Sequence, residues 1–213
     1  MVLKRKWLLE KWPFGHNNDF QRFVILCHPR TGSTWLHTLL NSNTRVMSYG
    51  EILTEKKSMT KLEEAIWSDH HSFIQAVGCK IFYEQLGDEQ FCHVLGEIAS
   101  NPNIKIIDLS RKDSRAAFSS LKIAKKSGTW SSTRNNQNKG NSVFIAEKES
   151  DSYTENLELN RARVLHELKF HEVFSLSYED LVRNEGREMD RVQNFLNVTP
   201  VSLFSLLRKQ ADV

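Results

Sequence analysis

The hydrophobic residues of the chain form two kinds of pattern that alternate along it. Short apolar runs with β character recur at 22–27, 78–83, 104–109 and 173–177, and each run is typical of a buried strand. Between them, apolar residues spaced three or four apart predict helices. Strands separated by helices pair in parallel through right-handed crossovers. The pattern therefore predicts an α/β fold of three layers, with a central parallel sheet flanked by helices.

Six helical patterns are expected. The fourth is the best delimited, because Asp113 can cap its N-terminus and Gly128 can end it. The second is expected across 62–77, either continuous or broken. The apolar residues that define the other four are Leu36, Leu39 and Leu40; Phe91, Val94, Leu95 and Ile98; Leu157, Val164, Leu165 and Leu168; and Met189, Val192, Phe195 and Leu196.

The composition of the chain is that of an ordinary globular protein. It has 213 residues, of which 39% are hydrophobic and 26% charged, so we expect residues 1–213 to form a single domain with a real core. No run of about 18 apolar residues could span a bilayer. The three cysteines form neither a disulfide framework nor a CxxC pair, which favours free thiols in a reducing, cytoplasmic setting.

The charge balance excludes some partners. A net charge of +3 is too weak a bias to predict nucleic-acid binding, so local clusters of cations matter more than their total. The histidines His70, His71 and His93 lack metal-ligand spacing, and we predict no metal site. The sequence does not indicate an oligomeric state.

The turn HPRTGSTW, residues 28–35, has the chemistry of an anion site. Gly32 allows a sharp turn after a strand, and the backbone N–H groups that follow it point outward at a helix N-terminus. Arg30 adds a forked cation, while Ser33 and Thr34 add hydroxyl donors. The same residue types also occur in ordinary helix-capping turns. The turn lacks the lysine and spacing of GxxxxGK[ST], which argues against an ordinary nucleotide triphosphatase.

A second cation, Arg111, follows the strand at 104–109, and Ser119 lies eight residues later in the next helix. Together with PRTGSTWL, this arrangement resembles the sulfotransferases that use 3′-phosphoadenosine 5′-phosphosulfate (PAPS). The segment SLSYEDLVRN is similar to a later strand and turn of that family, and KIAKKSGTW is similar to its bacterial trehalose-type branch. The resemblance covers most of residues 22–197.

The resemblance implies a P-loop-like domain that binds PAPS and releases 3′-phosphoadenosine 5′-phosphate (PAP). It implies that Arg111 and Ser119 hold the 3′-phosphate, and that no metal is needed. The sulfuryl group would pass to a hydroxyl of a carbohydrate or other small metabolite. Many relatives carry lysine where this chain has Arg30. The residues implied to hold the 5′-phosphosulfate are Arg30, Thr31, Gly32, Ser33, Thr34 and Trp35.

An acceptor hydroxyl must lose a proton, and Glu51 in SYGEIL is the preferred base because it matches a family position that resembles a catalytic glutamate. His37 is the rival, since it lies one helical turn beyond Ser33 and imidazole titrates near neutral pH. Lys80 could stabilise the sulfuryl group or orient the acceptor, although a lysine at its position is expected to face solvent more often than not. Arg30 would stabilise charge on the leaving oxygen.

The anion-binding turn leaves two other functions open. One is a nucleotide-kinase-like phosphotransferase, which would show magnesium-dependent transfer from ATP. The other is a nucleotide-binding module without catalysis. The identity of the acceptor is not indicated by the sequence.

Overall fold

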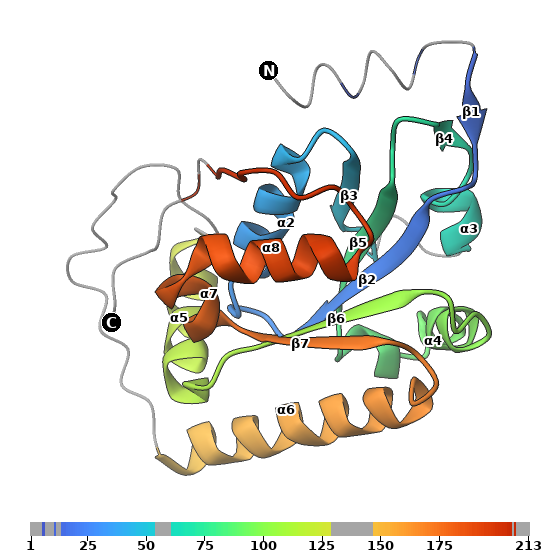
Figure 1. The fold of residues 1–213 in the computed structure, drawn as a ribbon. Helices are drawn as coiled ribbons and strands as arrows, with labels where there is room; N and C mark the ends of the chain where they lie inside the picture. Colours follow the sequence, from blue (N-terminus) through green and yellow to red (C-terminus); the bar gives the residue numbers. More distant parts are fainter. Residues whose placement is uncertain are drawn as a thin grey trace.

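The computed structural model describes residues 6, 11, 14–53, 61–128, 147–205 and 207, except for the side chains of 147 and 148. Its main sheet has five strands in the order β3-β5-β2-β6-β7, and all neighbouring pairs are parallel (Figure 1). The predicted α/β fold with a central parallel sheet is confirmed. The strands are β2 (Gln21–Cys27), β3 (Val46–Glu51), β5 (Ala76–Phe82), β6 (Lys105–Ser110) and β7 (Val173–Ser177).

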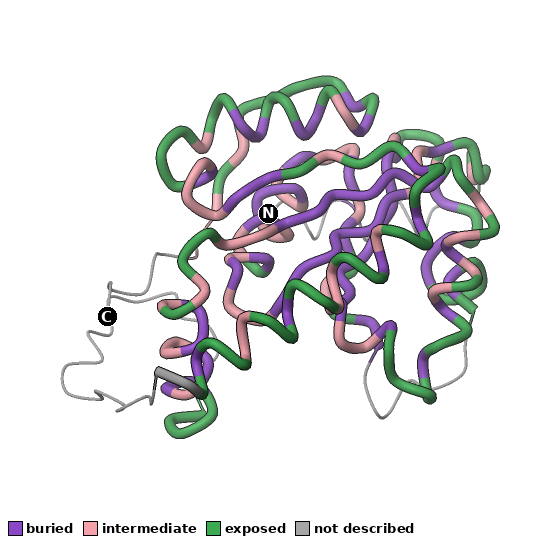
Figure 2. The backbone as a smooth tube through the Cα atoms, turned by 90° about the horizontal axis from the view of Figure 1, so that it is seen from below, coloured by how far each residue is buried: buried purple, intermediate pink, exposed green. Residues whose placement is uncertain are grey.

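Helices cover both faces of this sheet (Figure 1). Side chains alternate along β2, so Phe23 and Ile25 join the core on one face while Val24 and Leu26 join the core on the other. In Figure 2 the strands are the most continuously buried part of the backbone. One face packs against α2 (Ser33–Ser42), α7 (Tyr178–Arg183) and α8 (Glu185–Phe195), and the other against α3 (Leu62–Ala65), α4 (Cys92–Ala99) and α6 (Glu147–Glu167).

Four further elements lie in the described part of the chain. Helix α5 (Ser114–Ser127) follows β6, and a 3₁₀ helix, η2 (Gln85–Gly87), follows β5. Strand β1 (His16–Asn17) pairs antiparallel with β4 (His70–His71) in a separate two-stranded sheet. Among the described residues, no helix is both long and apolar enough to cross a membrane.

Most predicted elements are confirmed, and the exceptions have local causes. As predicted, the side chain of Asp113 caps α5 and Gly128 follows its last turn with a φ of 70°. The helix predicted across 62–77 is wrong beyond Ala65, because its helical spacing combines a short helix, strand β4 and the start of β5. Strand β3 was not predicted, because VMSYGE contains few apolar residues. Only two of its six residues are buried.

Helix α6 is fixed to the sheet through one buried carboxylate, that of Asp108 in β6. Asp108 is 1% exposed, and it accepts hydrogen bonds from Arg161 of α6 at 3.0 and 2.6 Å and from the Tyr83 hydroxyl at 2.7 Å. A buried carboxylate without such donors would be strongly destabilising. The three groups therefore set the position of α6 across its face of the sheet.

The strand order also identifies the edge where a ligand would bind. Strand β2 lies at the centre, with β5 on one side and β6 on the other. The connection from the carboxyl end of β2 runs through α2 to β3 on one side, whereas the connection from the neighbouring β6 runs to β7 on the other side. Open α/β sheets bind ligands where neighbouring connections diverge in this way. The turn at 28–32 lies there, between β2 and α2.

Candidate functional site

The turn between β2 and α2 is set by two residues with positive φ, Arg30 at 67° and Gly32 at 81°. Left-handed backbone is uncommon for a residue with a side chain. A Cβ on Gly32 would lie 2.6 Å from Cδ2 of Tyr178, so both the backbone and the packing require glycine. Thr31 donates its hydroxyl proton to the carbonyl of His28 at 2.8 Å. The Thr31 side chain thus closes the turn.

The N-terminus of α2 can receive an anion. Its first turn contains no acidic residue, and no side chain caps it. The backbone N–H groups there carry the partial positive charge of a helix N-terminus. Ser33 is buried and Thr34 is exposed at this end, while the half-buried ring of Trp35 lies edge-on to Tyr178, with centroids 6.3 Å apart. The arrangement suits a tetrahedral anion of the phosphate or sulfate type.

Arg30 and Arg111, which follow two different strands, lie beside each other at this turn. Arg111 donates from Nη1 to the carbonyl of Arg30 at 3.2 Å. Its Nε is buried and has no hydrogen-bond partner within the described residues. Burial, followed by the charge of Arg111, lowers the pKa of Arg30. An anion placed between the two groups would relieve this repulsion.

Ser119 lies beside this pair rather than in it. Its hydroxyl donates to the carbonyl of Arg115, one helical turn earlier, at 3.0 Å. The neighbouring Ser120 instead accepts a hydrogen bond from Nε of Arg30 at 2.9 Å. Rotation about χ1 would turn the Ser119 hydroxyl toward a ligand, because hydroxyl groups have three staggered positions.

Tyr178 links the two predicted anion sites, and the sequence pattern did not single it out. Its ring packs on Gly32, and the guanidinium of Arg111 lies 4.9 Å from the ring centroid. Cation–π attraction favours this position of the arginine. Tyr178 directly follows β7, the strand next to β6 in the sheet. The sequence signal that could have identified Tyr178 is therefore its position directly after a predicted strand.

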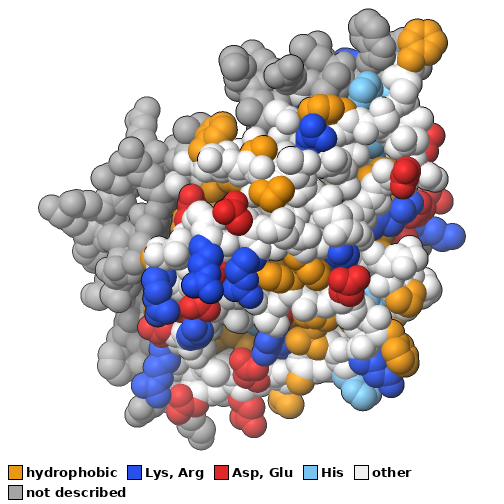
Figure 3. Space-filling model, viewed as in Figure 1, with side chains coloured by type: hydrophobic (Ala, Val, Ile, Leu, Met, Phe, Trp, Pro, Cys, Tyr) orange, Lys and Arg blue, Asp and Glu red, His pale blue; other side chains and the backbone are white. Residues whose placement is uncertain are grey.

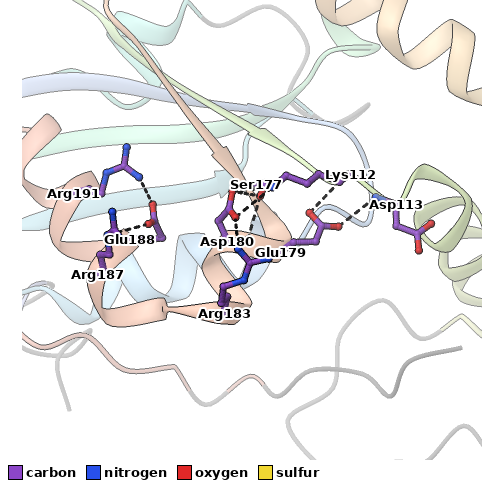
Figure 4. Close-up of polar contacts among 9 residues, drawn as sticks. All are labelled: Lys112, Asp113, Ser177, Glu179, Asp180, Arg183, Arg187, Glu188 and Arg191. Carbon is purple, nitrogen blue, oxygen red and sulfur yellow. Dashed lines mark hydrogen bonds and ion pairs between the residues drawn. The ribbon is translucent and has the colours of Figure 1, made fainter.

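The first turn of α7 holds the segment that follows Arg111 (Figure 4). Glu179 accepts a hydrogen bond from the backbone N–H of Lys112 at 3.1 Å, and Lys112 Nζ lies 3.2 Å from Asp180. A hydrogen bond from Ser177, and then one from Lys112, lowers the pKa of Asp180. These contacts hold the loop between β6 and α5 against α7, which restricts the backbone that carries Arg111.

Basic side chains also gather on the face of α7 and α8 seen in Figure 3. They are already paired with carboxylates (Figure 4): Arg183 with Asp180 at 3.7 Å, and Arg187 and Arg191 with Glu188 at 3.9 and 2.6 Å. The three arginines are exposed, and their pairing with Asp180 and the buried Glu188 leaves little net charge for a ligand. The arginines at the strand ends are the better anion site.

Glu51, Lys80 and Thr34 meet where β3 and β5 end and α2 begins. Nζ of Lys80 lies 2.7 Å from Oε1 of Glu51 and 3.3 Å from Oγ1 of Thr34. Lys80 is 3% exposed, so the expectation that it faces solvent was wrong. The reason is that β5 is covered on both faces. The Glu51 side chain is 46% exposed and remains accessible at this edge.

His37 is held in a different environment from Glu51. Its Nδ1 lies 2.8 Å from the hydroxyl of Ser48. Burial first, and then the charges of Lys80 and Lys6, lower the pKa of His37 to about 4. Catalytic bases work best with a pKa near the working pH, so these surroundings make His37 a weak base.

Within the described ranges, no group of three or more His, Cys, Asp or Glu residues could hold a metal ion. The absence of a metal from the reaction stays a prediction.

Residues 20–208 match the sulfotransferase domain family. The matched span contains the whole main sheet, both strand-end arginines and Glu51. The chain therefore belongs to the sulfotransferase domain family and is an enzyme that uses PAPS as its sulfuryl donor. This membership favours transfer of sulfate over the kinase-like and non-catalytic alternatives.

Individual relatives are distant but cover most of the chain. The protein is 27% identical to Nodulation protein H of Rhizobium tropici over 201 residues, which are 86% of this chain and 78% of the relative. It is 24% identical to Nodulation protein H of Rhizobium meliloti strain 1021 over 208 residues, 89% of this chain and 83% of the relative.

Replacing Gly32 with alanine tests the packing of the turn. We expect Gly32→Ala to lower the free energy of unfolding by about 2–5 kcal/mol, because a left-handed residue costs about 1–2 kcal/mol and overpacking against Tyr178 adds about 1–3 kcal/mol. Gly128→Ala is the matched control, since Gly128 also has a positive φ but a Cβ there would meet nothing within 4 Å. Urea denaturation measures both losses. Equal losses would show that Tyr178 does not constrain the turn.

The environment of His37 predicts a pH dependence of stability. Between pH 6.5 and 4 the unfolded chain binds a proton at this histidine that the folded chain does not, so stability falls as the pH is lowered through this range. The loss is at most about 3 kcal/mol. Urea denaturation at pH 7 and pH 4.5 should show a smaller loss for His37→Gln than for the wild type. An identical loss in both proteins would contradict a buried, neutral His37.

Proposed function

We propose that this enzyme transfers a sulfuryl group from PAPS to a hydroxyl of a carbohydrate or other small metabolite, with the donor bound across the ends of β2 and β6. The observation that carries the proposal is the contact of Arg111 with the carbonyl of Arg30, beside the uncapped N-terminus of α2. Together they offer two separate positions for anions. The donor carries phosphate-type groups at both its 5′ and its 3′ end.

At the 5′ end, Arg30 and the N–H groups from Gly32 to Trp35 would hold the phosphosulfate. The hydroxyls of Ser33 and Thr34 add donors, whereas the Thr31 hydroxyl serves the turn itself. At the 3′ end, Arg111 and Ser119 would hold the phosphate. The unpartnered Nε of Arg111 supports this part of the proposal, since a buried donor without a partner is costly and a phosphate oxygen would satisfy it.

Sulfuryl transfer, like phosphoryl transfer, passes in line through a loose transition state in which negative charge grows on the leaving oxygen. Cations and N–H groups that are already in place stabilise that charge without reorganisation. Arg30 and the first turn of α2 are suited to this role. Lys80, whose Nζ contacts Thr34 of that turn, can add positive charge on the acceptor side.

Glu51 is the base that we propose for the acceptor hydroxyl. Its carboxylate is accessible at the edge of the sheet and is oriented by the ammonium of Lys80 at 2.7 Å. His37 is the weaker candidate because its ring packs against Gly50 and its Nδ1 is held by the Ser48 hydroxyl at 2.8 Å. A base held by a buried lysine keeps a fixed direction, which favours transfer to one hydroxyl of the acceptor.

Few residues bear on a more precise assignment of the acceptor. Membership of the trehalose-type branch stays a prediction from KIAKKSGTW, in which Trp130 lies outside the described residues. The name of the nodulation relatives does not state an acceptor. We therefore keep carbohydrate and small-metabolite hydroxyls as the proposed class.

The assignment of Arg111 predicts a selective loss of nucleotide affinity. We expect Arg111→Ala to weaken PAP about 10- to 100-fold, as loss of a charge-assisted contact does, but to weaken adenosine 5′-phosphate far less. Isothermal titration of both nucleotides measures this difference. Lys125→Ala, which removes one exposed charge from the end of α5, should change neither affinity. Equal losses for the two nucleotides in Arg111→Ala would overturn the assignment.

The assignment of Glu51 predicts a loss of rate without a loss of donor binding. Glu51→Gln should lower kcat about 10²- to 10⁴-fold, the usual contribution of a general base, while PAP affinity changes little. His37→Gln should keep kcat within a few-fold. Transfer of labelled sulfate to an acceptor measures both variants. If His37→Gln loses the rate and Glu51→Gln keeps it, the roles of the two residues are reversed.

A further inference from the structure

We propose that His28, Glu84, Ser150 and Tyr153 form a polar subsite that binds hydroxyl groups of the acceptor away from the hydroxyl that is sulfated. This proposal rests on the proposed function, and it specifies which part of the protein would recognise the acceptor. None of the four side chains is assigned to the donor, although the backbone of His28 begins the turn whose later residues would hold it.

The first argument is the distribution of unsatisfied polar atoms. Six buried side-chain N or O atoms lack a hydrogen-bond partner among the described residues, and five of them lie at the carboxyl end of the sheet or the adjoining start of α6. One of these five is Nε of Arg111, at the donor site. The other four are Nε2 of His28, Oε2 of Glu84, Oγ of Ser150 and the hydroxyl of Tyr153.

These four atoms come from three separate elements that converge. His28 follows β2, Glu84 follows β5, and Nδ1 of His28 lies 2.9 Å from Oε1 of Glu84. Ser150 and Tyr153 lie one turn apart on α6. The pKa of Tyr153 is raised to about 12 by burial and then by the charge of Glu84, which indicates that the two groups are neighbours. His28 and Ser150 are 6% and 4% exposed.

The chemistry of the four groups matches hydroxyls. Because Nδ1 of His28 faces a carboxylate oxygen, Nδ1 carries a proton, and Nε2 is left for a polar group of the ligand. Oε2 of Glu84 is an acceptor, while Ser150 and Tyr153 can donate. A hydroxyl group donates and accepts at once, so a polyhydroxylated ligand satisfies both kinds of atom. Unpaired, each group would cost free energy in the folded protein.

The position of the subsite also indicates how large the acceptor must be. Tyr83, which precedes Glu84, packs in the core that contains α6, whereas Phe82 and α2 belong to the core on the other face. The subsite and the Glu51–Lys80 pair therefore lie on opposite sides of the sheet. An acceptor that uses both must reach across the carboxyl edge. This requirement favours an oligosaccharide over a single sugar ring.

Two tyrosines with buried hydroxyl groups allow a crossed test. The Tyr153 hydroxyl has no hydrogen-bond partner among the described residues and its ring stacks on Phe118 with centroids 4.3 Å apart, whereas the Tyr83 hydroxyl donates to Asp108 at 2.7 Å. The full-length enzyme is assayed with labelled PAPS and with glucose, N-acetylglucosamine, trehalose and cellobiose as probes. PAP affinity and Tm are measured on the same proteins.

We expect Tyr153→Phe to raise KM for a disaccharide acceptor about 3- to 10-fold, as loss of one neutral hydrogen bond does, and to leave Tm and PAP affinity unchanged. Glu84→Gln should raise that KM by about 10-fold or more, because a charged acceptor is lost. Tyr83→Phe should do the reverse, lowering Tm by several degrees while acceptor KM stays the same.

Three results would overturn the subsite. Unchanged KM in both Tyr153→Phe and Glu84→Gln would show that the acceptor does not contact these groups. A fall in Tm with parallel changes in KM and PAP affinity in Tyr153→Phe would show a structural role instead. PAP binding with transfer to glucose or N-acetylglucosamine as efficient as transfer to trehalose and cellobiose would contradict an acceptor that reaches across the carboxyl edge to the subsite. By contrast, failure to bind PAP would refute the donor site itself, so the two failures are distinguishable.

Discussion

Two guanidinium groups meet at the ends of adjacent strands, and the surrounding structure is arranged to hold them there. Arg30 and Arg111 follow β2 and β6, and burial followed by the charge of Arg111 lowers the pKa of Arg30. Tyr178 lies beside both turns, with its ring against Gly32 and Arg111. The acidic first turn of α7 then fixes the loop behind Arg111.

The parallel sheet explains why these groups can meet at all. Its strand order brings the ends of β5, β2 and β6 to one edge, with α2 starting from the centre of that edge. The proposed donor site, the Glu51–Lys80 pair and the proposed acceptor subsite are then three parts of a single edge. The buried Asp108 contributes indirectly, because it positions α6 and therefore Tyr153.

The parts of the site that the sequence predicted are those encoded by short-range patterns. The PRTGSTW turn and Arg111 each come just after an apolar run in the sequence, so their places at strand ends could be predicted from neighbouring residues. The burial of Lys80 could not, because it depends on helices that cover both faces of β5. Tyr178 and the His28–Glu84 contact likewise depend on which strands become neighbours. The periodicity of a single sequence does not reveal the order of the strands in the sheet.

The central claim is that one edge of the sheet holds both ends of the donor nucleotide. A crystal structure of the protein with PAP tests this claim most directly. We expect the 5′-phosphate at the backbone N–H groups of residues 32–35 beside Arg30, and the 3′-phosphate against Arg111 with the Ser119 hydroxyl turned toward it. A nucleotide bound elsewhere, or one whose 3′-phosphate lies in solvent away from Arg111, would contradict the account.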